Sequence, residues 1–360
     1  MALPGDERFA SAFSNVGAGP SGFPQAVRAG IHPVRSRKAM RYVLVMLALA
    51  GALHQSFASA QSYPNKPVRV IVPVPAGGTP DITARLVMPE LSGLLKQQFV
   101  VDNRPGAGSL IGAEIAAKAQ PDGYTLLFSS GGPLTILPHL QKKMPYRPLQ
   151  DLAPISLISS GPFVLITHPS SPFKSIGELA TLAKRTPGRF NYASAGNGSP
   201  NHLATELFKT MSGIDVTHVP YKGAPQGVTD VLANQINLNF SSIPPVLGHV
   251  RAGRLRALAT TGKKSSALLP DVPTITDTVA PGYEFTSWFG MLAPARTPSA
   301  VISRLHEAVA TVMRSPETRA QFEKRGADVV ASSPAEFGEH LRREFDRNGK
   351  AVKAAGIRID

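Results

Sequence analysis

The hydrophobic pattern between residues 61 and 260 alternates between two periods. Short runs rich in β-branched residues predict strands, and the segments between them carry apolar residues every three or four positions, as in helices with one buried face. The expected strands are 68–72, 99–101, 124–128, 163–166, 190–193, 216–219, 236–240 and 255–259, and the expected helices are 82–95, 111–119, 175–186, 200–211, 224–233 and 246–251. Strands that alternate with helices of about ten residues indicate βαβ units and mainly parallel sheets.

The C-terminal part has a different pattern, with helices and only short elements between them. Thr297-Pro298 precedes a helix whose apolar face holds Ile302, Leu305, Val309 and Val312, and a charged helix is expected over 334–354. Residues 61–360 contain no low-complexity linker and no fixed-period repeat. Since two domains without a linker are often joined by crossings between their sheets, we expect each domain to be discontinuous.

The first sixty residues follow a third pattern. Residues 1–39 are rich in Gly, Ala, Ser and Pro, a basic stretch runs from Arg35 to Arg41, and an apolar run covers 42–53 before Ala58-Ser59-Ala60. A basic stretch, an apolar run and an A-x-A site together predict a secretory signal peptide, with cleavage after Ala60. The apolar run is shorter than the ~20 residues that a membrane-spanning helix needs. Residues 1–60 are therefore expected to be an N-terminal extension plus a signal peptide.

Composition and charge narrow the functional classes. The 360-residue chain has 38 Lys+Arg and 24 Asp+Glu, a net charge of +14, and 42% hydrophobic residues, which excludes general disorder. Six of the basic and two of the acidic residues precede Gln61, so the 300 remaining residues carry +10. Since an exported protein does not meet nucleic acid, an anionic solute or membrane surface is the expected partner. The chain has no cysteine, so it cannot be lipid-anchored through one.

Two glycine-rich loops at predicted helix starts carry the most informative chemistry. They read AGGTPD at 76–81 and AGNGSPNH at 195–202, and each has a hydroxyl residue at the expected N-cap, Thr79 or Ser199, before a proline. Such loops direct backbone N–H groups at an anion. At ~1.5–3 kcal/mol for each hydrogen bond to a charged group, two facing loops would supply the ~8 kcal/mol of a micromolar site. Parallel sheets also need such turns without any ligand, so the loops alone leave both interpretations open.

Other motifs are weaker. The glycines of 106–112 have the spacing G-x-G-x-x-x-G rather than that of a dinucleotide fingerprint, and the chain has no G-x-S-x-G, no H-E-x-x-H and no clustered metal ligands. Asp81 is a candidate acceptor for a ligand or, alternatively, a favourable first-turn acid. Lys222 either reaches an anion or is a solvated turn lysine, and Trp288 is interpreted as a packing residue. We expect no catalytic residue, metal or cofactor.

A set of short motifs runs in a fixed order through the chain. They are YPNKP at 63–67, PAGGTPDITAR at 75–85, NRPGAG at 103–108, PDGYTL at 121–126, YASAG at 192–196, VPYKG at 219–223, DVPT at 271–274 and WFGMLAP at 288–294. This ordered set resembles the Bug-type solute receptors of tripartite tricarboxylate transporters. The family commonly has glycine at three positions where this chain has Ser109, Asn234 and Arg296. These three residues are therefore expected at turns whose backbone favours glycine.

The resemblance implies an α/β protein with a type II periplasmic binding protein fold, in which two α/β lobes with discontinuous chain crossings enclose an interlobe ligand cleft. Lobe 1 is expected over 61–163 and 287–360, and lobe 2 over 164–286. The family holds the carboxylate of a small organic acid or amino acid mainly through backbone amides and bridging waters. Carried over by matching position, the ligand-binding residues are Ala76, Gly77, Gly78, Asp81, Ser130, Ala195, Gly196, Ser199 and His202.

The expected function is that of a periplasmic receptor, acting as a monomer, that delivers its carboxylate to membrane transporter subunits. One alternative is a periplasmic serine hydrolase that uses Ser199 or Ser130 with His202. Another is a receptor that signals to a sensor kinase instead of feeding a transporter. The sequence does not identify the carboxylate.

Overall fold

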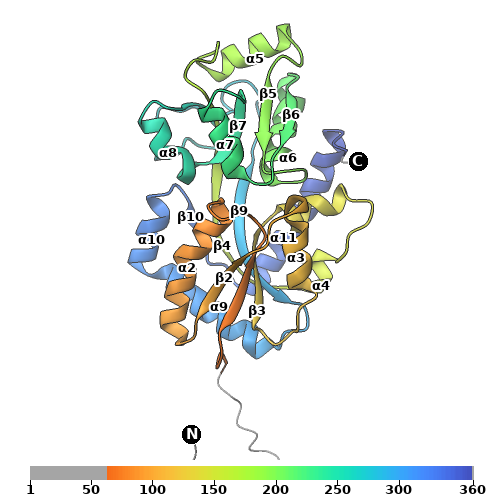
Figure 1. Ribbon diagram of the computed structural model, residues 1–360, viewed down its shortest axis with the longest axis vertical. Helices are drawn as coiled ribbons and strands as arrows, with labels where there is room; N and C mark the ends of the chain where they lie inside the picture. Colours follow the sequence, from red (N-terminus) through yellow and green to blue (C-terminus); the bar gives the residue numbers. More distant parts are fainter. Residues whose placement is uncertain (1–62, 359–360) are drawn as a thin grey trace, which may run out of the picture. The chain divides into compact units, whose positions relative to one another are not determined.

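The computed structural model describes residues 63–358, which belong to one compact unit, Gln61–Asp360 (Figure 1). The predicted signal peptide and its cleavage after Ala60 lie outside the described residues. Within 63–358, no helix has the length and the apolar content that crossing a membrane requires.

The first sheet forms around three parallel strands with helices between them. Its elements are β1 (Val68–Val72), α2 (Thr79–Leu95), β2 (Phe99–Asn103), α3 (Leu110–Ala117), β3 (Thr125–Ser130) and β9 (Thr286–Pro294). The strand order is β2-β1-β3-β9, and β9 runs antiparallel to β3. The parallel core follows from the alternating βα pattern of the sequence, and β9 enters from more than 150 residues further along the chain.

The second sheet repeats the parallel βα arrangement. Its elements are α5 (Ile176–Arg185), β5 (Asn191–Ser194), α6 (Pro200–Ser212), β6 (Thr217–Pro220), α7 (Ala224–Leu232), β7 (Leu238–Ser242), α8 (Ile243–Arg251) and β8 (Arg256–Thr260). β5 pairs in parallel with both β6 and β7. The predicted elements are all present here, with ends shifted by a few residues. Ser175 caps α5 by accepting a hydrogen bond from the Glu178 N–H, as the S-x-x-E pattern predicts.

A single long strand, β4 (Leu152–Thr167), belongs to both sheets. Nine of its first eleven residues pair with β9, and residues 163–166 pair with β7. The sequence predicted only 163–166, because the preceding stretch contains Pro154, Pro162, several serines and Gly161, which do not favour a strand. Pairing with β9 holds this stretch extended, through two shifts in register.

The C-terminal helices return to the first sheet. They are α9 (Ser299–Arg314), α10 (Pro316–Glu323) and α11 (Pro334–Ala354), with the short strand β10 (Asp328–Val329) between α10 and α11. The bounds of α11 match the prediction, because a capping box between Ser333 and Glu336 fixes its start. Phe337 of α11 packs with the buried Trp288, whereas Val352 packs in the core of the second sheet. Trp288 is thus a packing residue, as predicted.

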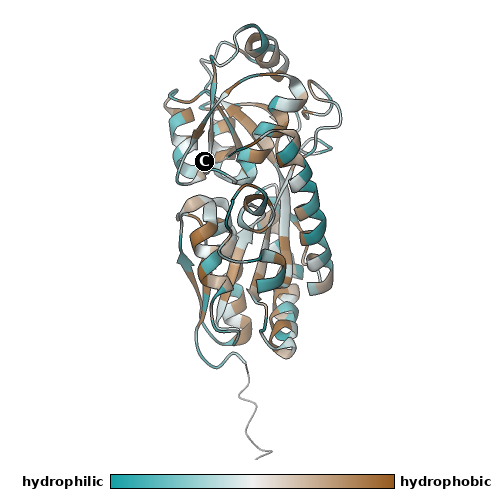
Figure 2. Cartoon of the chain, turned by 90° about the vertical axis from the view of Figure 1, so that its right-hand side faces the viewer, coloured by the Kyte–Doolittle hydropathy of each residue, from teal (hydrophilic) through white to brown (hydrophobic). Residues whose placement is uncertain are grey.

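Hydrophobic residues gather on the strands and on the helix faces turned toward them, as Figure 2 shows. Val70 of β1, Leu91 of α2 and Leu305 of α9 share one fully buried cluster, and Tyr192 of β5 and Phe208 of α6 share another. Each sheet therefore has its own core, and the short helical elements η2 (Ala107–Ser109), η3 (Gly132–Ile136), η4 (Leu137–His139) and α4 (Pro148–Asp151) lie in the connections.

Two of the three positions where the family commonly has glycine have the left-handed backbone that favours it. Ser109 has φ 82° and Asn234 has φ 56°. Arg296 lies in the exposed turn after β9 and is not among the residues with positive φ in the described chain. The prediction of a glycine-favouring turn is therefore confirmed for Ser109 and Asn234 and is wrong for Arg296.

Candidate functional site

A cavity of about 780 Å³ lies where the parallel strands of both sheets end. Its lining comes from the loops that follow β1, β2, β5 and β6, from the last residues of β3 and β7, from Phe163 within β4 and from the first residues of β9. In open α/β sheets the carboxyl ends of the strands are the usual place for a ligand. The volume lies in the range of small-molecule sites.

The structure brings four of the nine predicted site residues to this cavity. Gly78, Ser130, Ala195 and Ser199 line it. The other five predicted residues, Ala76, Gly77, Asp81, Gly196 and His202, belong to the same two loops or the helices that follow them but are not part of the lining. Their contacts assign several of them a supporting position.

The first loop starts α2 one residue earlier than the sequence predicts. Gly78 is the N-cap, with an extended backbone (φ −68°, ψ 154°), and its carbonyl accepts from the Ile82 N–H. The prediction that Thr79 caps the helix is wrong, since Thr79 is the first helical residue. Thr79 lines the cavity, and its hydroxyl group has no hydrogen-bond partner among residues 63–358. The start of α2 has no side-chain cap.

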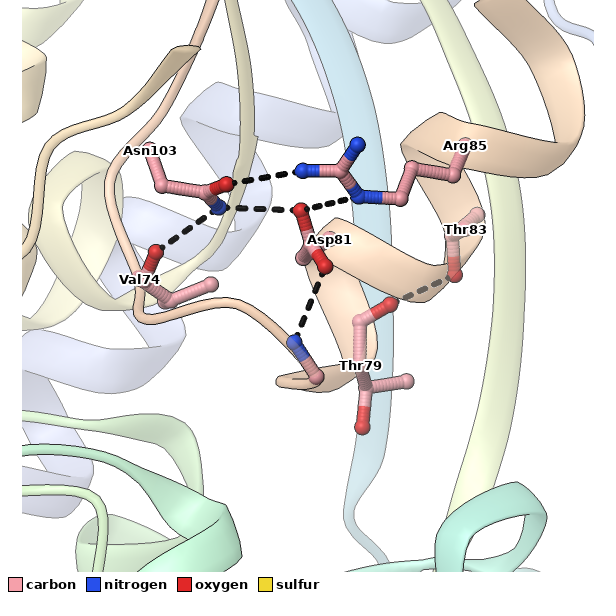
Figure 3. A network of polar contacts seen from close by, with 7 residues as sticks. Val74, Thr79, Asp81, Thr83, Arg85 and Asn103 are labelled. Atoms are coloured by element: carbon pink, nitrogen blue, oxygen red, sulfur yellow. Dashed lines mark hydrogen bonds and ion pairs between the residues drawn. The ribbon is translucent and has the colours of Figure 1, made fainter. Parts of the chain in front are cut away.

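Asp81 holds this loop from behind (Figure 3). One carboxylate oxygen accepts from the Gly77 N–H at 2.9 Å, and the other accepts from Arg85 Nε and Asn103 Nδ2, both at 2.9 Å. Burial raises the pKa of Asp81, but the hydrogen bonds from Arg85, Gly77 and Asn103 outweigh it and leave the pKa below its ordinary value. With three donors in place, this buried carboxylate positions the loop.

Asn103 extends the same network across two strands. Its amide nitrogen also donates to the Val74 carbonyl at 3.0 Å, and its amide oxygen accepts from Arg85 at 3.0 Å. The loop after β1 is therefore tied both to the first turn of α2 and to the end of β2 (Figure 3).

The second loop is held by its own polar atoms. Ser199 is the N-cap of α6 as predicted, but its hydroxyl donates back to the Gly196 carbonyl at 2.6 Å instead of capping the helix. The Ala195 N–H donates to Asn201, the Gly196 N–H to Ser194, the Gly198 N–H to His202 and the Ser199 N–H to Gly196. Among the N–H groups of 195–199, only that of Asn197 lacks a partner within the described chain.

Two stacked imidazole rings lie behind this loop. His202 and His218 stack with ring centroids 4.2 Å apart, and Tyr192 covers the other face of His218 at 4.8 Å. His202 Nδ1 accepts from the Gly198 N–H at 3.2 Å, and His218 Nε2 lies 2.6 Å from the Ser194 hydroxyl. Because His202 Nδ1 accepts from the Gly198 N–H, this nitrogen carries no proton and the His202 ring is neutral in this arrangement.

The surroundings keep these rings neutral. Burial, together with the nearby Lys209 charge, lowers the pKa of His202 to about 4. Burial likewise lowers the pKa of His218 to about 4, with a contribution from His202. Both imidazoles are therefore unprotonated near pH 7.

Two glycines allow the loops around the cavity to touch. A Cβ on Gly108, whose φ is 64°, would lie 2.3 Å from the Asn197 carbonyl oxygen. A Cβ on Gly223 would lie 2.7 Å from Pro75 Cγ. Real Cβ atoms do not approach this closely, so both contacts between segments far apart in sequence depend on glycine.

The cavity also contains residues that sequence reasoning missed or left undecided. Lys222, which was left undecided, lines it, as do the starts of α7 and α8 at Gly223 and Ser242. A small residue two positions before a proline marks both helix starts and could have signalled them. The aromatic residues Phe163, Phe240 and Phe289 also line it. In a strand such residues look like ordinary core positions, so the sequence held no signal for them.

The hydrolase alternative needs a serine hydrogen-bonded to a histidine at the cavity. In the described chain, neither Ser199 nor Ser130 makes such a bond, and His202 Nδ1 is occupied by the Gly198 N–H. No group of three or more His, Asp or Glu residues within 63–358 is arranged to hold a metal ion.

Known proteins match this chain along most of its length. The family model "Tripartite tricarboxylate transporter family receptor" matches residues 83–357. Protein BugT of Bordetella pertussis is 35% identical over 302 residues, which are 84% of this chain and 93% of BugT. Among solved structures, R. palustris Rpa4515 with adipate has a TM-score of 0.80 at 35% identity and covers 82% of this chain and 99% of its own.

A second solved structure, MatC from Rhodopseudomonas palustris with bound malate, has a TM-score of 0.77 at 28% identity. It covers 81% of this chain and 100% of its own. Structures similar to this chain include periplasmic binding proteins, which confirms the predicted type II periplasmic binding protein fold. The resemblance of the ordered motifs to Bug-type receptors is likewise confirmed. This chain belongs to the tripartite tricarboxylate transporter receptor family, whose members are periplasmic solute receptors.

Proposed function

We propose that this protein binds a small carboxylate in the cavity and delivers it to the membrane subunits of a tripartite tricarboxylate-type transporter. The lobes that enclose the ligand are 61–163 with 287–360, and 164–286. Rpa4515 holds adipate and MatC holds malate, and both of these ligands are dicarboxylates. The receptor acts as a monomer in the periplasm, after the signal peptide is removed at Ala60.

The observation that carries this proposal is the distribution of helix caps. Away from the cavity, the serine side chains of Ser175, Ser315 and Ser333 cap α5, α10 and α11, whereas α4 and α9 begin at Arg147 and Pro298 without a side-chain cap. The N-cap residues of α2, α3, α6, α7 and α8 all line the cavity, and none of these helix starts has a side-chain cap. Free N–H groups at a helix start bind anions.

Two backbone amides of the predicted loops are free to donate hydrogen bonds to an anion in the cavity. The N–H groups of Thr79 in the first loop and Asn197 in the second have no partner within the described chain, and both residues line the cavity. Each hydrogen bond to a carboxylate contributes about 1.5–3 kcal/mol, and each helix dipole about 0.3–1 kcal/mol. A few such bonds supply the ~8 kcal/mol of a micromolar complex without an arginine.

Closure of the two lobes would bring both loops onto one carboxylate. β4 and β9 connect the sheets and supply the hinge, and the contacts of Gly108 with Asn197 and of Gly223 with Pro75, which are already present in this structure, are those of the closed form. The protein acts by binding and release, and it has no catalytic role. After closure, the receptor docks on the transporter subunits. The alternative is that it docks on a sensor kinase and signals instead of delivering the ligand.

The test is to identify the native ligand. The protein is purified from its own periplasm and mildly denatured, and the released small molecules are identified by mass spectrometry. A thermal-shift panel of mono-, di- and tricarboxylates follows. We expect an intact carboxylate and a raised melting temperature. Turnover of the ligand that Ser199→Ala abolishes would show a hydrolase instead, and no response to any carboxylate would contradict the proposal.

A further inference from the structure

The charges around the cavity restrict the kind of carboxylate that fits it. Among residues 63–358, Lys222 and Tyr221 are the only ionisable side chains of the lining, and no Asp or Glu of this part of the chain contributes to it. The nearby acids are already engaged. Asp81 accepts three hydrogen bonds behind the first loop, and Asp230 accepts from the Tyr221 hydroxyl. An ammonium group of a ligand would therefore enter a site with no carboxylate to pair with.

The apolar part of the lining lies where the two sheets meet. Phe163 of β4, Phe240 of β7 and Phe289 of β9, which we call the aromatic lining, are exposed by 5%, 1% and 7%. Phe163 is backed by the ring of Phe285, stacked at 5.8 Å, so this surface is fixed by packing behind it. An apolar ligand body gains free energy on such a surface, whereas hydroxyl groups placed against it lose their hydrogen bonds with water.

Some hydroxyl groups of the lining already have hydrogen-bond partners, so they do not replace the hydrogen bonds that ligand hydroxyl groups lose with water. The Ser199 hydroxyl donates to the Gly196 carbonyl, and the Ser241 hydroxyl donates to the Ser242 carbonyl. The unpartnered N–H groups lie at the loop and helix starts, where the proposed function places the carboxylate. The cavity thus combines unpartnered N–H groups suited to an anion with an aromatic lining suited to hydrocarbon, and Ser130 and Ser287 line it next to Phe289.

We infer that the ligand is an organic acid with an apolar carbon body, without an ammonium group and without a chain of hydroxyl groups. This inference rests on the proposed function and narrows it, since it separates organic acids from amino acids. It also favours an adipate-like body over a malate-like one. The volume of about 780 Å³ leaves room for a body of six or more carbons.

Matched ligands test each part on the full mature protein by calorimetry. Adipate and 2-aminoadipate differ by one ammonium group, and adipate and galactarate differ by four hydroxyl groups. We expect adipate to bind at least about 100-fold more tightly than 2-aminoadipate, because an unpaired buried charge is costly. We expect a preference of at least about 10-fold over galactarate, since an apolar pocket rejects hydroxyl groups less strongly than charges.

A pair of variants links the preference to the aromatic lining. Phe289→Asn should reduce the preference for adipate over galactarate about 10-fold, whereas Phe289→Leu, which keeps an apolar side chain, should retain it. Thermal melting without ligand checks that both variants fold. If neither does, the ligand ratios of the wild-type protein decide alone.

The outcomes separate the two proposals. Equal binding of adipate and 2-aminoadipate, or of adipate and galactarate, overturns the inference and leaves the carboxylate receptor intact. If none of the three acids, nor any member of the wider carboxylate panel, binds, the proposed function fails and the inference fails with it.

Discussion

The two loops that start α2 and α6 have nearly the same sequence pattern and are held by opposite chemistry. The first is fixed by an ionised carboxylate, Asp81, which pairs with a cation, Arg85, whose side chain is 53% exposed. The second is fixed by the neutral rings of His202 and His218, packed behind it. In both arrangements, some loop N–H groups donate hydrogen bonds to these side chains, and others remain without a partner at the cavity.

The difference shows that a glycine-rich loop does not present all its amides to an anion. In each loop, side chains one turn further along the helix accept some N–H groups from behind, Asp81 from Gly77 and His202 from Gly198. Both acceptors lie four residues after the donor. This i to i+4 spacing places the acceptor beneath the loop, so the same geometry is achieved by a charged group and by a neutral one.

The largest expected effect comes from removing the charged anchor. Asp81→Ala removes a buried carboxylate and leaves the Gly77 N–H, Arg85 and Asn103 without this acceptor. At about 1.5–3 kcal/mol for a hydrogen bond to a charged group, unfolding by urea should show a loss of that order, and carboxylate affinity should fall about 100-fold. Asp151→Asn is the control, because its partner Arg147 is an exposed side chain away from the cavity. If Asp81→Ala binds the carboxylate with unchanged affinity, Asp81 does not position the first loop for binding.

A smaller effect is expected from the neutral anchor, with a conservative variant as the matched control. His202→Leu removes the acceptor of the Gly198 N–H and should weaken carboxylate binding about 10-fold, measured by calorimetry. His202→Asn places an amide oxygen near the position of Nδ1 and should retain most of the affinity. If the two variants bind equally well, the imidazole does not position the loop.

Acidification should affect the second loop before the first. His202 and His218 have a pKa of about 4 in the folded protein against about 6.5 when unfolded, so the unfolded state binds more protons between these values. Stability is therefore complete above about pH 6.5 and falls as the pH drops toward 4. The pKa of Asp81 lies below its ordinary value of 3.8, so its contribution is lost only at still lower pH.

Urea unfolding and carboxylate titrations between pH 7 and 4.5 measure this order. Both the free energy of unfolding and the affinity should decline over that range in the wild-type protein, and the decline should be shallower in His202→Asn, which removes one of the three rings, His202, His218 and His340, whose pKa is lowered to about 4. If stability and affinity fall equally steeply with pH in the wild type and in His202→Asn, protonation of His202 does not cause the decline.

The smallest expected effect concerns the unpartnered hydroxyl of the first loop. Thr79→Val keeps the shape of the side chain and removes the unpartnered hydroxyl group of a residue that lines the cavity, so affinity should fall about 3- to 10-fold with little change in stability. Thr83→Val is the comparison, because its hydroxyl already donates to the Thr79 carbonyl and not to the cavity. An affinity loss in Thr83→Val as large as in Thr79→Val would indicate an indirect effect.

Local sequence signals predicted the fold well where they act within one element. The capping box of Ser333 and Glu336 fixed the start of α11, and the S-x-x-E pattern at Ser175 fixed that of α5. The first part of β4 was missed because its extended form comes from pairing with β9, more than 120 residues away. Thr79 was assigned as a cap because a hydroxyl residue before a proline is the usual signal, yet Gly78 already has the extended backbone of an N-cap.

The candidate site was predictable only in outline. The two loops were found from glycine, hydroxyl and proline spacing, and residues of both line one cavity. Which N–H groups remain free depends on side chains such as His202 and Asn103, whose positions follow from tertiary packing. The aromatic lining is set by the meeting of β4, β7 and β9, which no local pattern encodes.

The most direct test of the central claim is a backbone amide NMR titration of the mature protein with adipate. If both loops hold one carboxylate through their free N–H groups, the Thr79 and Asn197 amide signals shift downfield together with a single dissociation constant. The Gly77 and Gly198 signals, whose N–H groups bond to Asp81 and His202, shift much less. Movement of only one loop, or larger shifts at Gly77 and Gly198 than at Thr79 and Asn197, would contradict the claim.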